Sequence, residues 1–183
     1  MIRPLASLQA ARRALCTAVP SFSGATSAEL AGTQGRYRGK TVIVTGGAKG
    51  IGEGCVRVFH EAGANVVFGD VDVDVGEALA TELNENAAYS SSNNAIAQFQ
   101  PCDVRHEAQL EALVGAAFAI EGRLDCVINN AGWHPPPTSI DDFSVADFTD
   151  LLALNLVSTF TLSKLALPQL RKTQGNIINV RSS

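Results

Sequence analysis

The stretch Thr41-Val-Ile-Val-Thr-Gly-Gly-Ala-Lys-Gly-Ile-Gly52 decides the fold of this chain. A β-branched apolar run comes first, a glycine-rich turn follows at once, and apolar residues then recur at roughly helical spacing as far as Ala62. This order predicts a buried strand, a tight turn and a helix. Gly46, Gly50 and Gly52 leave the turn without side chains that would block a pyrophosphate, and the helix N-terminus offers free N–H groups. The stretch therefore predicts a phosphate-binding turn of the dinucleotide type.

Strands and helices alternate along the rest of the chain in the same way. The apolar patterns predict strands at 41–44, 65–68, 97–100, 124–128 and 176–180. They predict helices at 51–62, 74–83, 107–120 and 144–172, and the polar stretch 84–94 predicts a surface loop. Helical crossovers favour parallel pairing of the strands. We therefore expect an α/β fold, a Rossmann-type doubly wound parallel sheet that stops after about five strands in the order 3-2-1-4-5, with ligands at the carboxyl ends of the strands.

Composition disfavours several classes of protein. The chain has 183 residues, 46% of them apolar, which predicts about one domain with a substantial core. A balance of 14 basic against 18 acidic residues gives a net charge of −4, so no nucleic-acid partner is expected. No apolar run is long enough to predict a membrane span. The four cysteines, Cys16, Cys55, Cys102 and Cys126, form no CxxC pair, so the sequence predicts no metal site among them.

The composition changes near residue 35, which predicts an N-terminal extension over 1–34 and an incomplete nucleotide-binding domain over 35–183. Residues 1–28 contain Arg3, Arg12 and Arg13 but no Asp or Glu. An acid-free, hydroxyl-rich segment with arginines is typical of a mitochondrial transit peptide. An ordinary disordered N-terminus is the alternative, and both interpretations stay open.

Asp70 ends the second predicted strand and points to the choice of dinucleotide. A carboxylate at this position accepts hydrogen bonds from the adenosine ribose hydroxyls and repels a 2′-phosphate, which favours NAD over NADP. Lys49 in the glycine turn acts in the opposite sense, because a cation there attracts a 2′-phosphate. We expect the better-placed Asp70 to prevail. The alternative is a solvated loop acid, since Asp72 and Asp74 lie beside it.

Several further motifs follow the glycine turn in a fixed order. They are Cys102-Asp-Val104, Asn129-Asn-Ala-Gly132, Asn155 in an apolar helical stretch, and the strand Gly175-Asn-Ile-Ile-Asn-Val180. With the glycine turn, this set resembles the short-chain dehydrogenase/reductase family over about residues 36–182, and within it the 17-beta-hydroxysteroid dehydrogenases. The resemblance implies NAD-dependent oxidation of a secondary alcohol, either a hydroxysteroid or a sugar such as L-fucose. It also implies a cytoplasmic homo-oligomer, a tetramer or a dimer.

The resemblance further implies a role for individual residues. Cofactor contacts fall on the glycine turn, on the acidic residue Asp70 that would bind the adenosine ribose, on the pair Asp103 and Val104 that would bracket the adenine, and on the segment beside the nicotinamide. Asn155 would hold a proton-relay water, Ser182 would hydrogen-bond the substrate oxygen, and His134 would form part of the substrate-pocket wall. The cofactor-binding residues carried over in this way are Gly46, Lys49, Gly50, Ile51, Gly52, Asp70, Asp103, Val104, Asn130 and Gly132, and no metal ligand is among them.

The sequence departs from the family pattern at two points. Arg181 stands where the family usually has a first serine, which weakens the alignment of Ser182. The Tyr-x-x-x-Lys pair expected after that serine is absent from the 183 residues, and neither Tyr37 nor Tyr89 is placed to replace it. The tyrosine is the general acid/base of the family. We therefore expect this chain to be inactive alone. A non-catalytic nucleotide-binding fragment or a truncated isoform is the alternative function.

Overall fold

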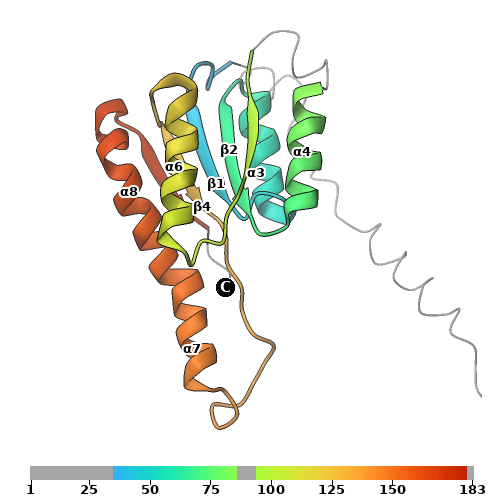
Figure 1. Cartoon of the computed structure of the whole chain (residues 1–183), viewed down its shortest axis with the longest axis vertical. Helices are drawn as coiled ribbons and strands as arrows, with labels where there is room; N and C mark the ends of the chain where they lie inside the picture. The colour runs from blue at the N-terminus through green and yellow to red at the C-terminus, as the bar shows by residue number, and fades with distance from the viewer. Residues whose placement is uncertain (1–34, 86–93, 181–183) are drawn as a thin grey trace, which may run out of the picture. The chain divides into compact units, whose positions relative to one another are not determined.

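The computed structural model describes residues 35–85 and 94–180. The predicted N-terminal extension, Cys16, Tyr89 and Ser182 lie outside these ranges. Five parallel strands form one sheet in the order β3-β2-β1-β4-β5, which confirms the predicted topology (Figure 1). Each strand differs from its predicted bounds by one or two residues at an end. The strands are β1 Thr41–Thr45, β2 Asn65–Asp70, β3 Ala97–Pro101, β4 Cys126–Asn129 and β5 Asn176–Asn179.

Helices cover both faces of the sheet (Figure 1). On one face α3 packs over β1 and β2 and α4 over β2 and β3, and on the other α6 and α8 pack side by side over the strands. The helical stretch that follows β4 runs through α7, a π-helical turn η1 and α8 without a break. The helices are α3 Gly50–Glu61, α4 Val73–Glu85, α6 Glu107–Glu121, α7 Val145–Leu152, η1 Ala153–Val157 and α8 Ser158–Thr173.

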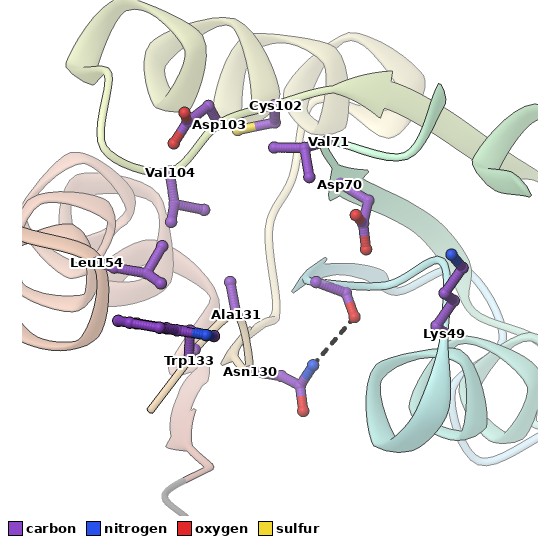
Figure 2. A pocket seen from close by; sticks show the side chains of 12 residues that line it. Lys49, Asp70, Val71, Cys102, Asp103, Val104, Asn130, Ala131, Trp133 and Leu154 are labelled. Carbon is purple, nitrogen blue, oxygen red and sulfur yellow. Dashed lines mark hydrogen bonds between the residues drawn. The ribbon is translucent and has the colours of Figure 1, made fainter. Parts of the chain in front are cut away.

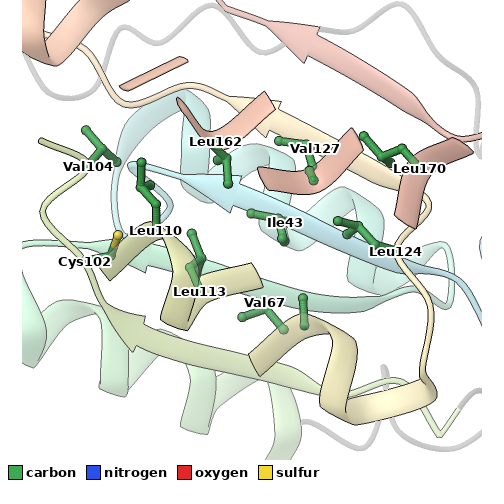
Figure 3. Packing of buried hydrophobic residues seen from close by; sticks show 12 residues of the cluster. Ile43, Val67, Cys102, Val104, Leu110, Leu113, Leu124, Val127, Leu162 and Leu170 are labelled. Atoms are coloured by element: carbon green, nitrogen blue, oxygen red, sulfur yellow. The ribbon is translucent and has the colours of Figure 1, made fainter. Parts of the chain in front are cut away.

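Strand β1 shows why the apolar runs are continuous. Because successive side chains of a strand point to opposite faces, Val42 and Val44 enter the cluster under α3 and α4, whereas Ile43 enters the cluster under α6 and α8. Figure 3 shows Ile43 among side chains of α6 and α8, including Leu110 and Leu162. A strand buried on both faces needs apolar residues at every position. Each fully buried side chain of this kind contributes about 1.5–3 kcal/mol of transfer free energy.

The helix faces differ in part from the sequence prediction. Helical spacing suggested that Ile51 and Val58 belong to the apolar face of α3, yet they are 68% and 63% exposed. The buried face of α3 instead follows a spacing of four residues through Gly52, Val56 and His60. His60 is thus buried although it is polar. Phe118 is exposed, because α6 packs through Leu110, Leu113 and Ala117.

The helical stretch Val145–Thr173 begins with a side-chain cap, since Ser144 Oγ accepts the N–H of Asp147 at 3.0 Å. Pro168 lies inside α8, which continues past it to Thr173. By length and composition the stretch meets the requirement for crossing a membrane, with a mean hydropathy of 1.4 over its most apolar window, of which 17% is buried. That differs from the prediction that no segment is apolar enough. Part of its apolar surface nevertheless packs in the core, through Leu162, Ala166 and Leu170.

Candidate functional site

At Gly46 and Gly52 the turn between β1 and α3 has room only for glycine. Gly46 has a φ of +62°, a left-handed conformation that side chains rarely adopt. A Cβ added to Gly52 would lie 1.9 Å from the carbonyl oxygen of Gly46. Lys49, the N-cap of α3, makes no side-chain cap hydrogen bond. The first turn of α3 therefore presents backbone N–H groups and its positive dipole end to the loop, as anion binding at a helix N-terminus requires.

Asp70 is fixed against this turn by backbone donors. One carboxylate oxygen accepts the N–H of Ala48 at 3.0 Å, and the other accepts the N–H of Asp72 at 3.1 Å. Lys49 does not pair with Asp70, because its ammonium group donates a hydrogen bond to Asp72. That hydrogen bond lowers the pKa of Asp72 and raises the pKa of Lys49. The two carboxylates beside the turn, those of Asp70 and Asp72, thus have defined partners, and only Asp72 pairs with a charged group.

A threonine at the end of β1 ties the turn to the segment that follows β4. Thr45 Oγ1 accepts the N–H groups of Asn130 and Ala131 at 3.0 and 3.1 Å. The amide of Asn130 donates in return to the carbonyl oxygens of Thr45 and Gly46 at 3.1 and 3.0 Å. These bonds join the ends of two neighbouring strands, and they hold Asn130 against the glycine turn (Figure 2).

A first cavity of about 390 Å³ opens at the carboxyl ends of the strands. In Figure 2, Asp70 and Val71 face Val104 across it, and Asn130 and Trp133 close its other side. Cys102 lies in its wall, and burial raises the pKa of that thiol to about 11, so the thiol stays neutral near pH 7. The lining is formed by Gly46, Lys49, Asp70, Val71, Cys102, Asp103, Val104, Asn130, Ala131, Gly132, Trp133 and Leu154.

The carboxylate of Asp103 is engaged by a neighbouring cation. Arg105 Nε lies 3.0 Å from one carboxylate oxygen of Asp103, and Arg105 Nη2 lies 2.6 Å from the other. This hydrogen bonding holds the pKa of Asp103 below its usual range. The backbone N–H of Asp103 donates to Gln109 Oε1 at 2.6 Å. Asp103 is therefore an oriented, ionised acceptor at the edge of the first cavity.

A second cavity of about 470 Å³ shares the segment from Asn130 to Trp133 with the first. His134 and Asn155 line it, together with apolar side chains of the long helical stretch. The imidazole Nδ1 of His134 lies 3.0 Å from the carbonyl oxygen of Pro135. The full lining of the second cavity is formed by Ile51, Asn130, Ala131, Gly132, Trp133, His134, Leu151, Leu152, Asn155, Leu156, Thr159 and Val180.

Asn155 lies in the π-helical turn and clamps the segment between the two cavities. Its Oδ1 accepts the N–H of Trp133 at 3.0 Å, and its Nδ2 donates to the carbonyl oxygen of Trp133 at 2.7 Å. Nδ2 also donates to the carbonyl oxygen of Leu151 at 3.1 Å. A Cβ added to Gly132 would lie 2.9 Å from Asn155 Oδ1, so this close approach requires glycine. Turns of π-helix occur frequently at functional sites.

The structure brings together most of the residues that the sequence singled out. Gly46, Lys49, Asp70, Asp103 and Val104 line the first cavity, Ile51, His134 and Asn155 line the second, and Asn130 and Gly132 line both. Gly50 and Gly52 shape the turn without lining either cavity, and Ser182 is not described. Within the described ranges no group of three or more His, Cys, Asp or Glu could hold a metal ion.

Sequence reasoning missed several residues of the site. Val71 directly follows Asp70, so its position in the wall of the first cavity beside that carboxylate could have been predicted from the sequence. Thr45 carries the hydrogen bonds of the turn, but a threonine at a strand end gives no signal of its own. Leu154 and Trp133 enter the first cavity only because the long helical stretch lies beside the segment after β4.

Comparison with known proteins identifies this arrangement. A family model described as short chain dehydrogenase matches residues 40–183. The chain belongs to the short-chain dehydrogenase family. The curated members that it resembles include L-fucose dehydrogenase of Bos taurus and of Mus musculus, each 48% identical over 147 residues, which is 80% of this chain and 50% of the relative. Tropinone reductase-like 2 of Erythroxylum coca is 39% identical over 138 residues, covering 74% of this chain and 46% of the relative.

Solved structures of other short-chain dehydrogenases share the fold. A 7 alpha-hydroxysteroid dehydrogenase complexed with NADH and 7-oxo glycochenodeoxycholic acid matches with a TM-score of 0.72 and 33% identity, covering 82% of this chain and 56% of that one. A metagenomic short-chain oxidoreductase in complex with NADP matches with a TM-score of 0.70 and 28% identity, covering 80% of this chain and 63% of that one. This short-chain dehydrogenase chain spans about half the length of the curated relatives that it matches.

Proposed function

We propose that this short-chain dehydrogenase binds NAD in the joined cavities and serves the oxidation of a secondary alcohol, with L-fucose as the first candidate substrate. The observation that carries the proposal is the position of Asp70, whose carboxylate is fixed beside the glycine turn at the edge of the first cavity. Membership of the family supports oxidoreduction as the reaction class. The choice of cofactor and substrate is inferred from the residues of the two cavities.

The two cavities fit an extended dinucleotide. The glycine turn and the N-terminus of α3 suit a pyrophosphate, because a side chain at Gly52 would meet the backbone of the turn. Val71 and Val104 suit the two faces of an adenine ring, with Asp103 as a hydrogen-bond acceptor at its edge. The shared segment leads from this half into the second cavity, where a nicotinamide ring would lie beside Asn130. Held there, NAD would supply the hydride acceptor for oxidation of the alcohol carbon.

Asp70 favours NAD over NADP in this proposal. Its carboxylate lies where the adenosine ribose belongs, and a 2′-phosphate would bring like charges within a few ångströms of each other. In a partly screened cleft this repulsion costs about 1–4 kcal/mol, or roughly 10- to 1000-fold in affinity. Among the solved relatives, one was crystallised with NADH and another with NADP, so the family alone does not decide between them.

The second cavity and the relatives support a sugar substrate. The L-fucose dehydrogenases are 46–48% identical to this chain. The indole of Trp133, the imidazole of His134 and the hydroxyl of Thr159 give the cavity an aromatic face and polar groups. Leu152 and Leu156 add apolar surface, and this surface supports a hydroxysteroid as the alternative substrate.

The proton of the alcohol needs an acceptor, and the general base of the family, a tyrosine, has no counterpart among the side chains that line the described cavities. Asn155 uses its amide to bind the backbone of Trp133, and an amide does not take up a proton near pH 7. Neither lining contains a tyrosine, and Tyr37 packs against Phe59 with 4.8 Å between ring centroids. We therefore propose that the 183-residue chain binds NAD but does not turn over alcohol by itself.

The test is NADH formation from NAD and L-fucose, followed by absorbance. It compares the 183-residue chain alone with the same chain joined to the C-terminal half of the bovine L-fucose dehydrogenase. We expect turnover only in the joined protein, and more slowly with a 17-beta-hydroxysteroid than with L-fucose. Equal turnover by the chain alone would show that the proton acceptor has been misplaced. Oxidation of the steroid without oxidation of L-fucose would contradict the proposed substrate.

A homo-oligomer is the proposed assembly of the active protein. Phe148 and Phe160 are large apolar side chains exposed on the long helical stretch, a surface that a protein contact would cover. Light scattering of the joined protein tests this assembly, and a monomer at micromolar concentration would contradict it.

A further inference from the structure

A single cation lies beside two carboxylates at the adenosine end of the first cavity. Among the described residues that line this cavity, Lys49 is the one with a positive side chain. It lies at the N-cap of α3, whereas Asp70 ends β2 and Asp72 follows two residues later. The Lys49 ammonium group pairs with Asp72, not with Asp70. The Lys49–Asp72 pair thus joins a residue of the glycine turn to the residue whose backbone N–H also fixes Asp70.

The two carboxylates have different tasks because their partners differ. Both oxygens of Asp70 accept backbone N–H groups, from Ala48 and from Asp72, so its position does not depend on Lys49. The carboxylate of Asp72 instead accepts a hydrogen bond from the lysine, which lowers the pKa of Asp72 more than the backbone hydrogen bond from Val75 does. Asp72 therefore stays ionised through the neutral range, and its hold on Lys49 persists there.

We propose that Asp72 is a specificity-determining residue that acts through Lys49: it holds the one cation of the first cavity away from a 2′-phosphate and so strengthens the preference for NAD. The proposal rests on the proposed binding of NAD. Without Asp72 the lysine, whose side chain is 65% exposed, is free to turn toward a phosphate on the ribose. Asp70 would repel the 2′-phosphate, and Asp72 would remove the group that could compensate for that repulsion.

The expected effect is modest because the pair is exposed. Exposed ion pairs contribute little, and freeing Lys49 should therefore tighten NADPH binding by roughly two- to fivefold. NADH carries no 2′-phosphate, so its affinity should stay within about twofold. Since salt screens such charges, the gain for NADPH should shrink between low and high ionic strength.

The test is calorimetric titration of the 183-residue chain with NADH and NADPH, for the wild type, Asp72→Asn, Lys49→Met and the double variant. Asp74→Asn is the matched control, because Asp74 carries the same charge two residues further on and is not the partner of Lys49. We expect a lower Kd for NADPH in Asp72→Asn, no such change in Asp74→Asn, and a much smaller effect of Asp72→Asn when Lys49 is already replaced.

The possible results separate this inference from the proposed function. The same gain for NADPH in the Lys49→Met background, or in Asp74→Asn, would show that only the net charge matters and would overturn the role through Lys49. Saturable NADH binding with no gain in Asp72→Asn would overturn the inference alone. No saturable NADH binding by the wild type would overturn the proposed function, and the inference with it.

Discussion

Replacing Thr45 with valine should destabilise the chain, although the two side chains have nearly the same shape. Thr45 is buried, and its hydroxyl oxygen accepts the N–H groups of Asn130 and Ala131 at 3.0 and 3.1 Å. Valine removes the acceptor from both donors. A buried donor without a partner costs about 1–3 kcal/mol, and both donors are half-buried, so we expect a loss of about 2–4 kcal/mol in the free energy of unfolding.

Thr41 offers a matched control in the same strand. It is fully buried, and its hydroxyl oxygen has no hydrogen-bond partner among the described residues. Thr41→Val therefore removes a buried polar group without leaving a donor unpaired, and should be neutral or stabilising. Urea unfolding followed by circular dichroism measures both variants, and Thr45→Ser should restore most of the lost stability. Equal destabilisation by the two valine substitutions, or a change below about 0.5 kcal/mol for Thr45→Val, would refute the reasoning.

Two further predictions concern charge, and a third concerns localisation. Asp70→Ser should narrow the preference for NADH over NADPH by roughly 10-fold or more in fluorescence titrations, and an unchanged ratio would contradict the role given to Asp70. Arg105→Ala should lower stability near neutral pH, but the difference from wild type should vanish in acid. The reason is that Arg105 lowers the pKa of Asp103 in the folded chain, and the resulting stability is fully present above the ordinary pKa range of Asp. This stability is lost as the pH falls through the pKa of Asp103 in the folded chain. Unfolding curves recorded from pH 7 into the acid range measure the difference between the two proteins. Residues 1–28 fused to a fluorescent reporter should direct it to mitochondria, and a diffuse signal would reject the transit-peptide interpretation.

The strand order and the sheet edge that carries the site could be predicted from sequence because both depend on local patterns. Continuous apolar runs such as Val42–Val44 mark strands buried on both faces, and helical crossovers restrict their connections. Ligand residues then fall at the carboxyl ends, where Asp70 and Asn130 indeed lie. A resemblance of ordered motifs supplied the individual roles.

Contacts between distant elements could not be predicted. The burial of His60 depends on how α3 rotates against β1 and β2, which its own apolar spacing does not settle. The partner of Asn155 is the backbone of Trp133, and no sequence pattern links the two. The pairing of Lys49 with Asp72, and not with Asp70, likewise depends on where α3 and β2 place their ends.

Energy transfer from Trp133 to bound NADH tests the central claim most directly. Trp133 is the single tryptophan of the chain, and it lines both cavities. If the joined cavities hold the dinucleotide, NADH should quench the Trp133 emission saturably and give sensitised nicotinamide emission. Excess NAD should reverse the effect, and NADPH should require a much higher concentration. Absence of saturable transfer, or equal transfer with NADPH, would contradict the assignment of this cleft as an NAD site.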